Sequence, residues 1–277
     1  MKQIIGHKIQ IEQLMQLIQN NRLSHAYIFE GHEGIGKFLV AKKIAAEILG
    51  VNDIDLDASE LSIIEPEDGL IKISKIRQLG EDIILKPTIS KRKVFIIRDG
   101  ELMNEAAQNA LLKVLEEPPE YAVIIITTSN KEKLIRTIKS RCTSFKFLPL
   151  SEEQLKEFYK NEDIDDDIIK LSRGSIGKVE KLKEKEYVKD IIQIYKSLKD
   201  KNLLDLNKTF TKLKEYKEDI QDILEIIILK YFDEINENYT KRVQQIEIVE
   251  KCRQDLRRNA NFDIALDYMM LQLWEIE

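Results

Sequence analysis

The stretch HAYIFEGHEGIGKF, residues 25–38, decides how this chain begins to fold. It opens with an apolar run, 26–29, that is typical of a buried strand, and a glycine-rich segment follows at once. A helical pattern starts at Lys37 and runs to Leu49, and Gly50 ends it. A strand, a loop of the form G-x-x-x-x-G-K and a helix in this order predict a phosphate-binding loop.

The chemistry of this loop explains its residue types. Gly31, Gly34 and Gly36 let backbone N–H groups close around phosphate oxygens, and the helix N-terminus adds a positive dipole end. Lys37 is expected against the β- and γ-phosphates. Phe38 follows, where the motif requires the Ser or Thr hydroxyl that binds Mg²⁺. The loop therefore keeps its phosphate groups and lacks one magnesium ligand.

The acidic half of an ATPase site is expected after a second apolar strand, and the run 94–97 is that strand. Arg98 stands where an Asp should support Mg²⁺, and Asp99 stands where an acid should polarise water. Phe38 and Arg98 are far apart in sequence but belong to one predicted site. Together they argue against ATP hydrolysis, and they leave nucleotide binding without turnover open beside a relic loop that binds nothing.

The rest of the chain divides by composition. Strand-like runs alternate with helical patterns through residue 150, which predicts a parallel sheet covered on both faces, with strands at 26–29, 61–64, 94–97, 123–127 and 144–147. A short helical piece follows, with Ser151 as N-cap and Gln154 completing a capping box. The last hundred residues contain no Gly or Pro and are predicted to be all-helical. We expect three domains, at 1–150, 151–180 and 181–277.

Composition excludes several classes of protein. The 277 residues carry a formal net charge of −5, which does not suit a free-standing nucleic-acid binder. Two cysteines, far apart, and three histidines, all before residue 33, argue against a disulfide framework or a zinc site. No signal peptide or apolar run of membrane-spanning length is present, so we expect a cytoplasmic protein without membrane contact.

Three further motifs carry a family resemblance. They are NALLKVLEEPP at 109–119, the triplet Ser140-Arg141-Cys142 and GSIGK at 174–178. With the phosphate loop they resemble bacterial clamp-loader subunits of the AAA+ family over roughly residues 4–180. The resemblance implies an α/β AAA+ domain with a five-stranded parallel sheet, a small helical lid and an all-α C-terminal collar for oligomerisation.

Within that family, the departures resemble the delta-prime type. The ATP-hydrolysing gamma/tau subunits carry Thr or Ser, Asp-Glu and a lid arginine at the positions of Phe38, Arg98-Asp99 and Gly177. They also carry a four-cysteine zinc module where this chain has the acidic, cysteine-free stretch 52–68. Delta-prime relatives often keep those cysteines, so their absence is a departure that leads us to expect no zinc.

The resemblance implies a role in replication. It implies a non-catalytic subunit of the DNA polymerase III holoenzyme, a DNA-directed DNA polymerase, that assembles with gamma/tau and delta subunits. That complex would load the sliding clamp onto primed DNA. Arg141, flanked by Ser140 and Cys142, would reach a neighbour's ATP site, where a forked cation stabilises charge on the transferred phosphoryl group. The alternative for Arg141 is a surface arginine beside a buried cysteine.

Three other questions stay open at this point. Lys37 and Asp99 would support an active or nucleotide-binding P-loop ATPase subunit of a replication complex. The basic residues within 131–141 would either face DNA or form a solvated helix face. Thr127, Thr128 and Ser129 would either sense a phosphate or bond to nearby backbone.

Overall fold

The computed structural model describes residues 4–51, 60–185, 187, 190–191, 194–195, 198 and 211–276. The chain forms two compact units, one of Met1–Asp163 with Arg173–Gly177 and one of Ile164–Ser172 with Lys178–Glu277. The expected lid, 151–180, is shared between these units, and the division into three domains stays a prediction. Parts of the expected acidic stretch and of the expected collar lie outside the described residues.

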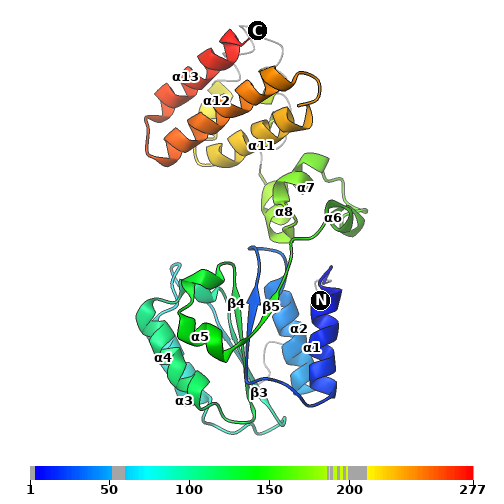
Figure 1. The fold of residues 1–277 in the computed structure, drawn as a ribbon, viewed down its shortest axis with the longest axis vertical. Coiled ribbons are helices and arrows are strands. Elements are labelled where there is room, and N and C mark those ends of the chain that lie inside the picture. The colour runs from blue at the N-terminus through cyan, green and yellow to red at the C-terminus, as the bar shows by residue number, and fades with distance from the viewer. Residues whose placement is uncertain are drawn as a thin grey trace. The chain divides into compact units, whose positions relative to one another are not determined.

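The first unit is built on a five-stranded sheet (Figure 1). All pairings are parallel, and the spatial order is β2-β3-β4-β1-β5. The strands are β1 (Ala26–Glu30), β2 (Leu61–Ile64), β3 (Lys93–Ile97), β4 (Ala122–Thr128) and β5 (Thr143–Lys146). The predicted five-stranded parallel sheet is therefore confirmed, with strand ends within one residue of those expected.

Helices cover both faces of this sheet (Figure 1). Tyr27 and Phe29 point to one face and pack with α1 (Lys8–Gln19) and α2 (Lys37–Leu49). Ile28 lies between them in sequence and belongs to the opposite core, which contains α3 (Ile73–Asp82), α4 (Glu105–Glu116) and α5 (Arg136–Arg141). Alternate strand residues face opposite sides, so a sheet buried on both faces needs strands that are apolar throughout.

The strand order brings three functional segments to one edge. The phosphate loop follows β1, the pair Arg98-Asp99 follows β3, and Thr127 and Thr128 end β4. Since β3, β4 and β1 are neighbours and parallel, their carboxyl ends meet, as is usual for ligand sites in open α/β sheets. Helix α6 (Glu152–Phe158) begins farther along the first unit with the predicted capping box.

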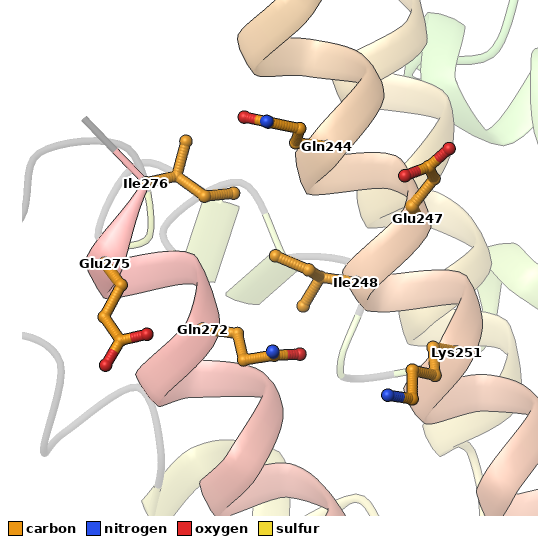
Figure 2. A pocket seen from close by; sticks show the side chains of 7 residues that line it. All are labelled: Gln244, Glu247, Ile248, Lys251, Gln272, Glu275 and Ile276. Atoms are coloured by element: carbon orange, nitrogen blue, oxygen red, sulfur yellow. The ribbon is translucent and has the colours of Figure 1, made fainter.

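The second unit is helical in its described part. Its helices are α7 (Asp166–Ser172), α8 (Ile176–Lys183, which begins in the first unit), α11 (Ile220–Asp233), α12 (Tyr239–Arg257) and α13 (Phe262–Glu275). A shallow groove between α12 and α13 is lined by Ile248, Ile276 and polar side chains (Figure 2). None of the described helices has the length and apolarity needed to cross a membrane.

Glu60 fixes the loop that leads into β3. Its carboxylate accepts backbone N–H groups of Thr88, Ile89 and Ser90 at 2.7, 2.6 and 2.7 Å, and the residue is 6% exposed. Hydrogen bonds from Ser90, together with the backbone bonds, lower the pKa of Glu60 from 4.5 to about 2. The folded state therefore favours the charged carboxylate more strongly than the unfolded chain does.

Replacing Glu60 by Gln should reduce stability in a pH-dependent way. Because the folded-state pKa is lowered, the contribution of the carboxylate is present above the ordinary pKa of 4.5 and is lost as pH falls toward about 2. Urea unfolding should give Glu60→Gln a lower midpoint than wild type at neutral pH, and the difference should shrink over that range. Glu47→Gln, an exposed change on α2, is the control. A difference independent of pH would contradict this role.

Candidate functional site

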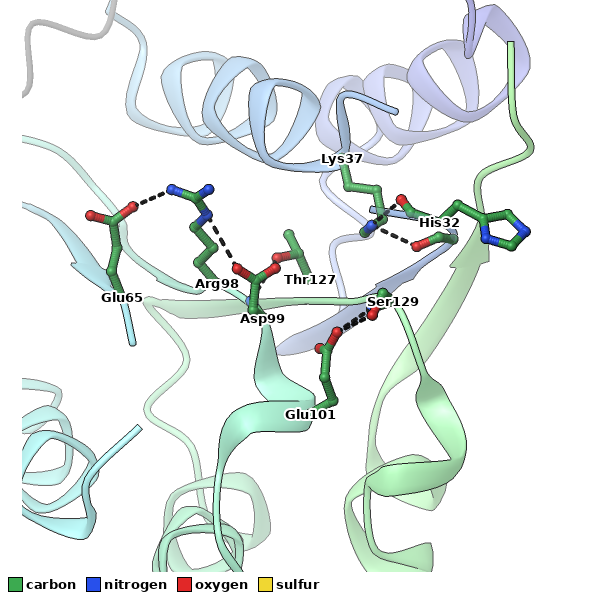
Figure 3. A network of polar contacts seen from close by, with 9 residues as sticks. His32, Lys37, Glu65, Arg98, Asp99, Glu101, Thr127 and Ser129 are labelled. Carbon is green, nitrogen blue, oxygen red and sulfur yellow. Dashed lines mark hydrogen bonds and ion pairs between the residues drawn. The ribbon is translucent and has the colours of Figure 1, made fainter. Parts of the chain in front are cut away.

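The phosphate loop has its expected shape. Gly34 and Gly36 adopt φ values of 75° and 101°, in the left-handed region that glycine tolerates, and Gly36 is the N-cap of α2. The ammonium of Lys37 donates to the carbonyl oxygens of Gly31 and His32, both at 2.6 Å (Figure 3). Lys37 is 6% exposed, and burial lowers its pKa. Two of its three N–H donors are thus used by its own loop.

The loop is held from two further directions. His7 Nε2 lies 2.8 Å from the carbonyl oxygen of Ile35. The N–H of Gly177 donates to the carbonyl oxygen of Gly34 at 3.0 Å, and a Cβ on Gly34 would collide with the hydroxyl of Ser175. The segment around Gly177, predicted from the lid motif, therefore packs directly on the loop.

Phe38 and Arg98, which stand at the two positions predicted to have lost a magnesium ligand, lie against each other. The guanidinium carbon of Arg98 is 5.1 Å from the centre of the Phe38 ring, within cation–π range. Arg98 Nη1 also donates to Glu65 Oε1 at 2.8 Å (Figure 3). Where an intact site would offer a hydroxyl and a carboxylate to Mg²⁺, this chain places an aromatic ring and a fixed cation.

Asp99 lies where the water-polarising acid was predicted. It adopts φ 54°, and its N–H donates to Thr127 Oγ1 at 3.2 Å. Its carboxylate is 3.4 Å from Arg98 Nε, and burial raises its pKa. The acid is therefore present, but it is paired with the arginine beside it.

Glu101 is a site residue that sequence reasoning did not single out. Its Oε1 accepts the N–H of Ser129 at 2.8 Å and also the Ser129 hydroxyl. Burial alone would raise the pKa of Glu101, but the hydrogen bonds of Ser129 lower it. Glu101 also acts electrostatically on Lys37. The sequence did contain a signal for this residue, because Glu101 is a second acid, two residues after Asp99, at the carboxyl end of a central strand.

Arg141 is the last residue of α5, and its hydrogen bonds are to residues outside the phosphate loop. Its Nη1 donates to the carbonyl oxygen of Thr137 at 3.1 Å, and its Nη2 donates to Glu116 Oε1 at 3.0 Å. Its side chain is 34% exposed. No hydrogen bond or ion pair within the described part of the chain joins Arg141 to residues 31–38.

The neighbours of Arg141 in the triplet make local contacts. The Ser140 hydroxyl donates to the carbonyl oxygen of Thr137 at 3.0 Å. Cys142 packs against the core on the α4 side of the sheet, and burial raises the pKa of its thiol to about 12. A thiol with this pKa stays protonated at neutral pH and behaves as a small apolar residue.

The basic stretch 131–141 is only partly neutralised. Lys139 pairs with Glu132 at 2.8 Å, and Lys131 lies 3.9 Å from Glu30. Lys133 and Arg136 are exposed. Among the described residues, no group of three or more His, Cys, Asp or Glu could hold a metal ion. Residues 52–59 of the acidic stretch, where the family resemblance raised the question of zinc, are outside the described part.

Sequence comparison places this geometry among known proteins. A family described as "DNA polymerase III, delta subunit" matches residues 6–151. DNA polymerase III subunit gamma of Buchnera aphidicola (subspecies Acyrthosiphon pisum) is 32% identical over 190 residues, which are 62% of this chain and 53% of the relative. DNA polymerase III subunit delta' of Bacillus subtilis is 30% identical over 172 residues, 57% of this chain and 52% of the relative. The chain thus spans about half the length of these relatives.

Solved structures support the same fold. A DNA polymerase III gamma subunit-related protein of Thermotoga maritima superposes with a TM-score of 0.61 at 21% identity, over 96% of this chain and 99% of that one. The RuvB Holliday junction branch migration motor of the same organism gives 0.50 at 18% identity, over 85% and 78% of the two chains. These likenesses concern the fold, and they confirm the predicted α/β AAA+ architecture.

The family match covers more than half of the chain, and it includes the phosphate loop, the Arg98-Asp99 pair and the Arg141 triplet. The resemblance to clamp-loader subunits predicted from those motifs is therefore confirmed. This chain belongs to the DNA polymerase III delta subunit family, among clamp-loader-type subunits of the gamma, tau and delta-prime kind.

Proposed function

We propose that this chain is a delta-prime-type clamp-loader subunit that hydrolyses no ATP itself and donates Arg141 to the ATP site of a neighbouring gamma/tau subunit. The observation that carries the proposal is the contact between Phe38 and Arg98. It fills the place of the magnesium ligands with a ring and a cation, while Arg141 remains available at the end of α5.

Physical reasons oppose hydrolysis at the chain's own loop. A phenyl ring offers Mg²⁺ no oxygen, and the guanidinium of Arg98 repels a divalent cation. Arg98 also neutralises Asp99, which lies 3.4 Å away. Phosphoryl transfer depends on metal placement, so a loop without magnesium ligands retains only its phosphate-binding groups, the backbone N–H groups and Lys37.

Arg141 suits the task of a trans-acting arginine. Its charge is fixed, and its planar fork matches phosphate oxygens. It forms no bond to its own phosphate loop, and a third of its side chain is accessible. An arginine supplied by a neighbour stabilises negative charge as the γ-phosphoryl group leaves, which is worth ~10³–10⁵ in rate.

The partners in this proposal are gamma/tau and delta clamp-loader subunits, with the predicted collar, 181–277, joining them. The complex would act on the sliding clamp and, through it, on primed DNA. The chain would require no resident metal, and binding of ATP without hydrolysis is compatible with the role. Sequence similarity to a delta' and to gamma subunits supports this assignment.

Replacing Arg141 by Ala should disable one ATP site of the assembled loader. We expect hydrolysis at the completed neighbouring site to fall by ~10³–10⁵, because the developing phosphoryl charge loses its fixed cation. The measurement is clamp- and DNA-stimulated ATPase of a loader reconstituted with gamma/tau and delta subunits. A single-turnover assay should show one ATP fewer hydrolysed rapidly per complex.

Arg77→Ala removes an exposed arginine on α3 and serves as the matched control. Size-exclusion chromatography checks that both variants assemble. Unchanged ATPase in a fully assembled Arg141→Ala loader would show that the arginine is structural and would refute the proposed donation.

An ATP-hydrolysing subunit is the second candidate, and the positions of two side chains favour it. Lys37 lies on the loop where a phosphate-binding lysine belongs, and Asp99 lies at the carboxyl end of β3. This candidate requires magnesium-dependent turnover by the chain alone, which the first candidate forbids.

Lys37→Ala separates the two candidates. Under our proposal, the isolated chain turns over no ATP, and the substitution does not change that. It should lower stability by about 1–3 kcal/mol, because two loop carbonyls lose their donor. Urea unfolding measures that loss, with Lys43→Ala on the same helix as control. Magnesium-dependent turnover by the isolated chain, abolished in Lys37→Ala, would favour the second candidate instead.

A further inference from the structure

The ion pair between Arg141 and Glu116 joins the ends of two helices. Glu116 is the last residue of α4, and Arg141 is the last residue of α5. The Nη2–Oε1 distance is 3.0 Å, and the carboxylate has no other ion pair in the described part of the chain. Glu116 therefore contacts Arg141, the side chain that we propose acts at the ATP site of a neighbouring subunit.

This contact leaves the guanidinium able to bind a further anion. Arginine has five N–H donors, and two are used here, one by Glu116 and one by the carbonyl oxygen of Thr137. Three donors remain. Because the two acceptors hold different terminal nitrogens, they fix the orientation of the guanidinium plane as well as its place.

The supports for this orientation are themselves fixed. The buried side chain of Gln108, two turns before Glu116 on α4, donates to the carbonyl oxygens of Met103 and Lys133 at 3.0 and 3.1 Å. Its Oε1 accepts the N–H of Ile135, the N-cap of α5, at 2.8 Å. Helix α4 thus holds the first turn of α5 through Gln108 and the last residue of α5 through Glu116.

The same pair contributes little to the stability of the fold. Both side chains are partly exposed, Arg141 at 34% and Glu116 at 51%, and exposed pairs are typically weak. What the pair restricts is the set of rotamers open to a long, flexible side chain. Such positioning matters for catalysis, because a small displacement of a charge-stabilising group lowers the reaction rate.

We propose that Glu116 is a positioning residue that holds the Arg141 guanidinium in the orientation in which it meets the phosphates of a neighbouring subunit. This inference rests on the proposed function. Glu116 acts through Arg141 and touches no nucleotide. Removing it should affect the transition state at the neighbour's site and leave nucleotide affinity there unchanged.

The test uses the reconstituted loader and single-turnover ATP hydrolysis. Glu116→Ala should lower the single-turnover rate constant at the neighbour's site on the order of 10-fold, as expected for a misplaced group, with the half-saturating concentration of ATP unchanged. Glu116→Gln keeps an oxygen acceptor at the same place and should recover most of the lost rate. Glu117→Ala, an exposed acid one residue farther on, is the matched control and should behave as wild type.

A double-mutant cycle identifies the route of the effect. In an Arg141→Ala background, Glu116→Ala should cause no additional loss, because the group that it positions is gone. An equal loss in both backgrounds would mean that Glu116 acts on the fold, and a faster Glu116→Ala loader would mean that the carboxylate only restrains the arginine. Either result overturns the inference.

The same measurements distinguish a failure of the positioning role of Glu116 from a failure of the proposed function. A loss with Arg141→Ala and none with Glu116→Ala would reject the positioning role alone. No loss with either substitution would reject both, because there would be no trans arginine to position.

Discussion

Burial of a parallel sheet on both faces is the constraint on which the site depends. Helices α1 and α2 cover one face, and α3, α4 and α5 cover the other, so β1, β3 and β4 are apolar over 26–29, 94–97 and 122–126. Polar chemistry is thereby confined to strand ends. Because these three strands are adjacent and parallel, their carboxyl ends converge. The phosphate loop, Asp99 and Thr127 meet for that reason.

The charges at this edge are balanced from within the chain. Lys37 donates to carbonyl oxygens of its own loop, and Arg98 pairs with Glu65 and Asp99. In an ATPase site, such lysine and acid side chains are completed by the nucleotide and its metal. Here the guanidinium of Arg98 pairs with the nearby acids Glu65 and Asp99 without any ligand. Under the function proposed above, this internal balance of charge belongs to a subunit that keeps the fold of an ATPase without its activity.

The arginine triplet is attached to a different part of the framework. Helix α5 belongs to the α4 side of the sheet, and its orientation depends on Gln108 and Glu116 of α4. In the described part of the chain, Phe38 and Arg98 form no hydrogen bond or ion pair with Gln108 or Glu116, so the departures at these two positions leave the supports of Arg141 intact. Under the function proposed above, this separation lets one chain lose the chemistry of its own site and retain an arginine for the site of a neighbour.

The sequence by itself determined the parallel sheet, the phosphate loop, its two altered magnesium positions and the capping box at Ser151. Each of these follows from local patterns of apolar residues, glycines and caps, which act over a few positions along the chain. The contacts that complete the site are different, because they join residues distant in sequence. Ser129 with Glu101, Gly177 with Gly34 and Arg141 with Glu116 carry no local signal. Only the tertiary structure decided them, since strand order and helix packing set which side chains come within bonding distance.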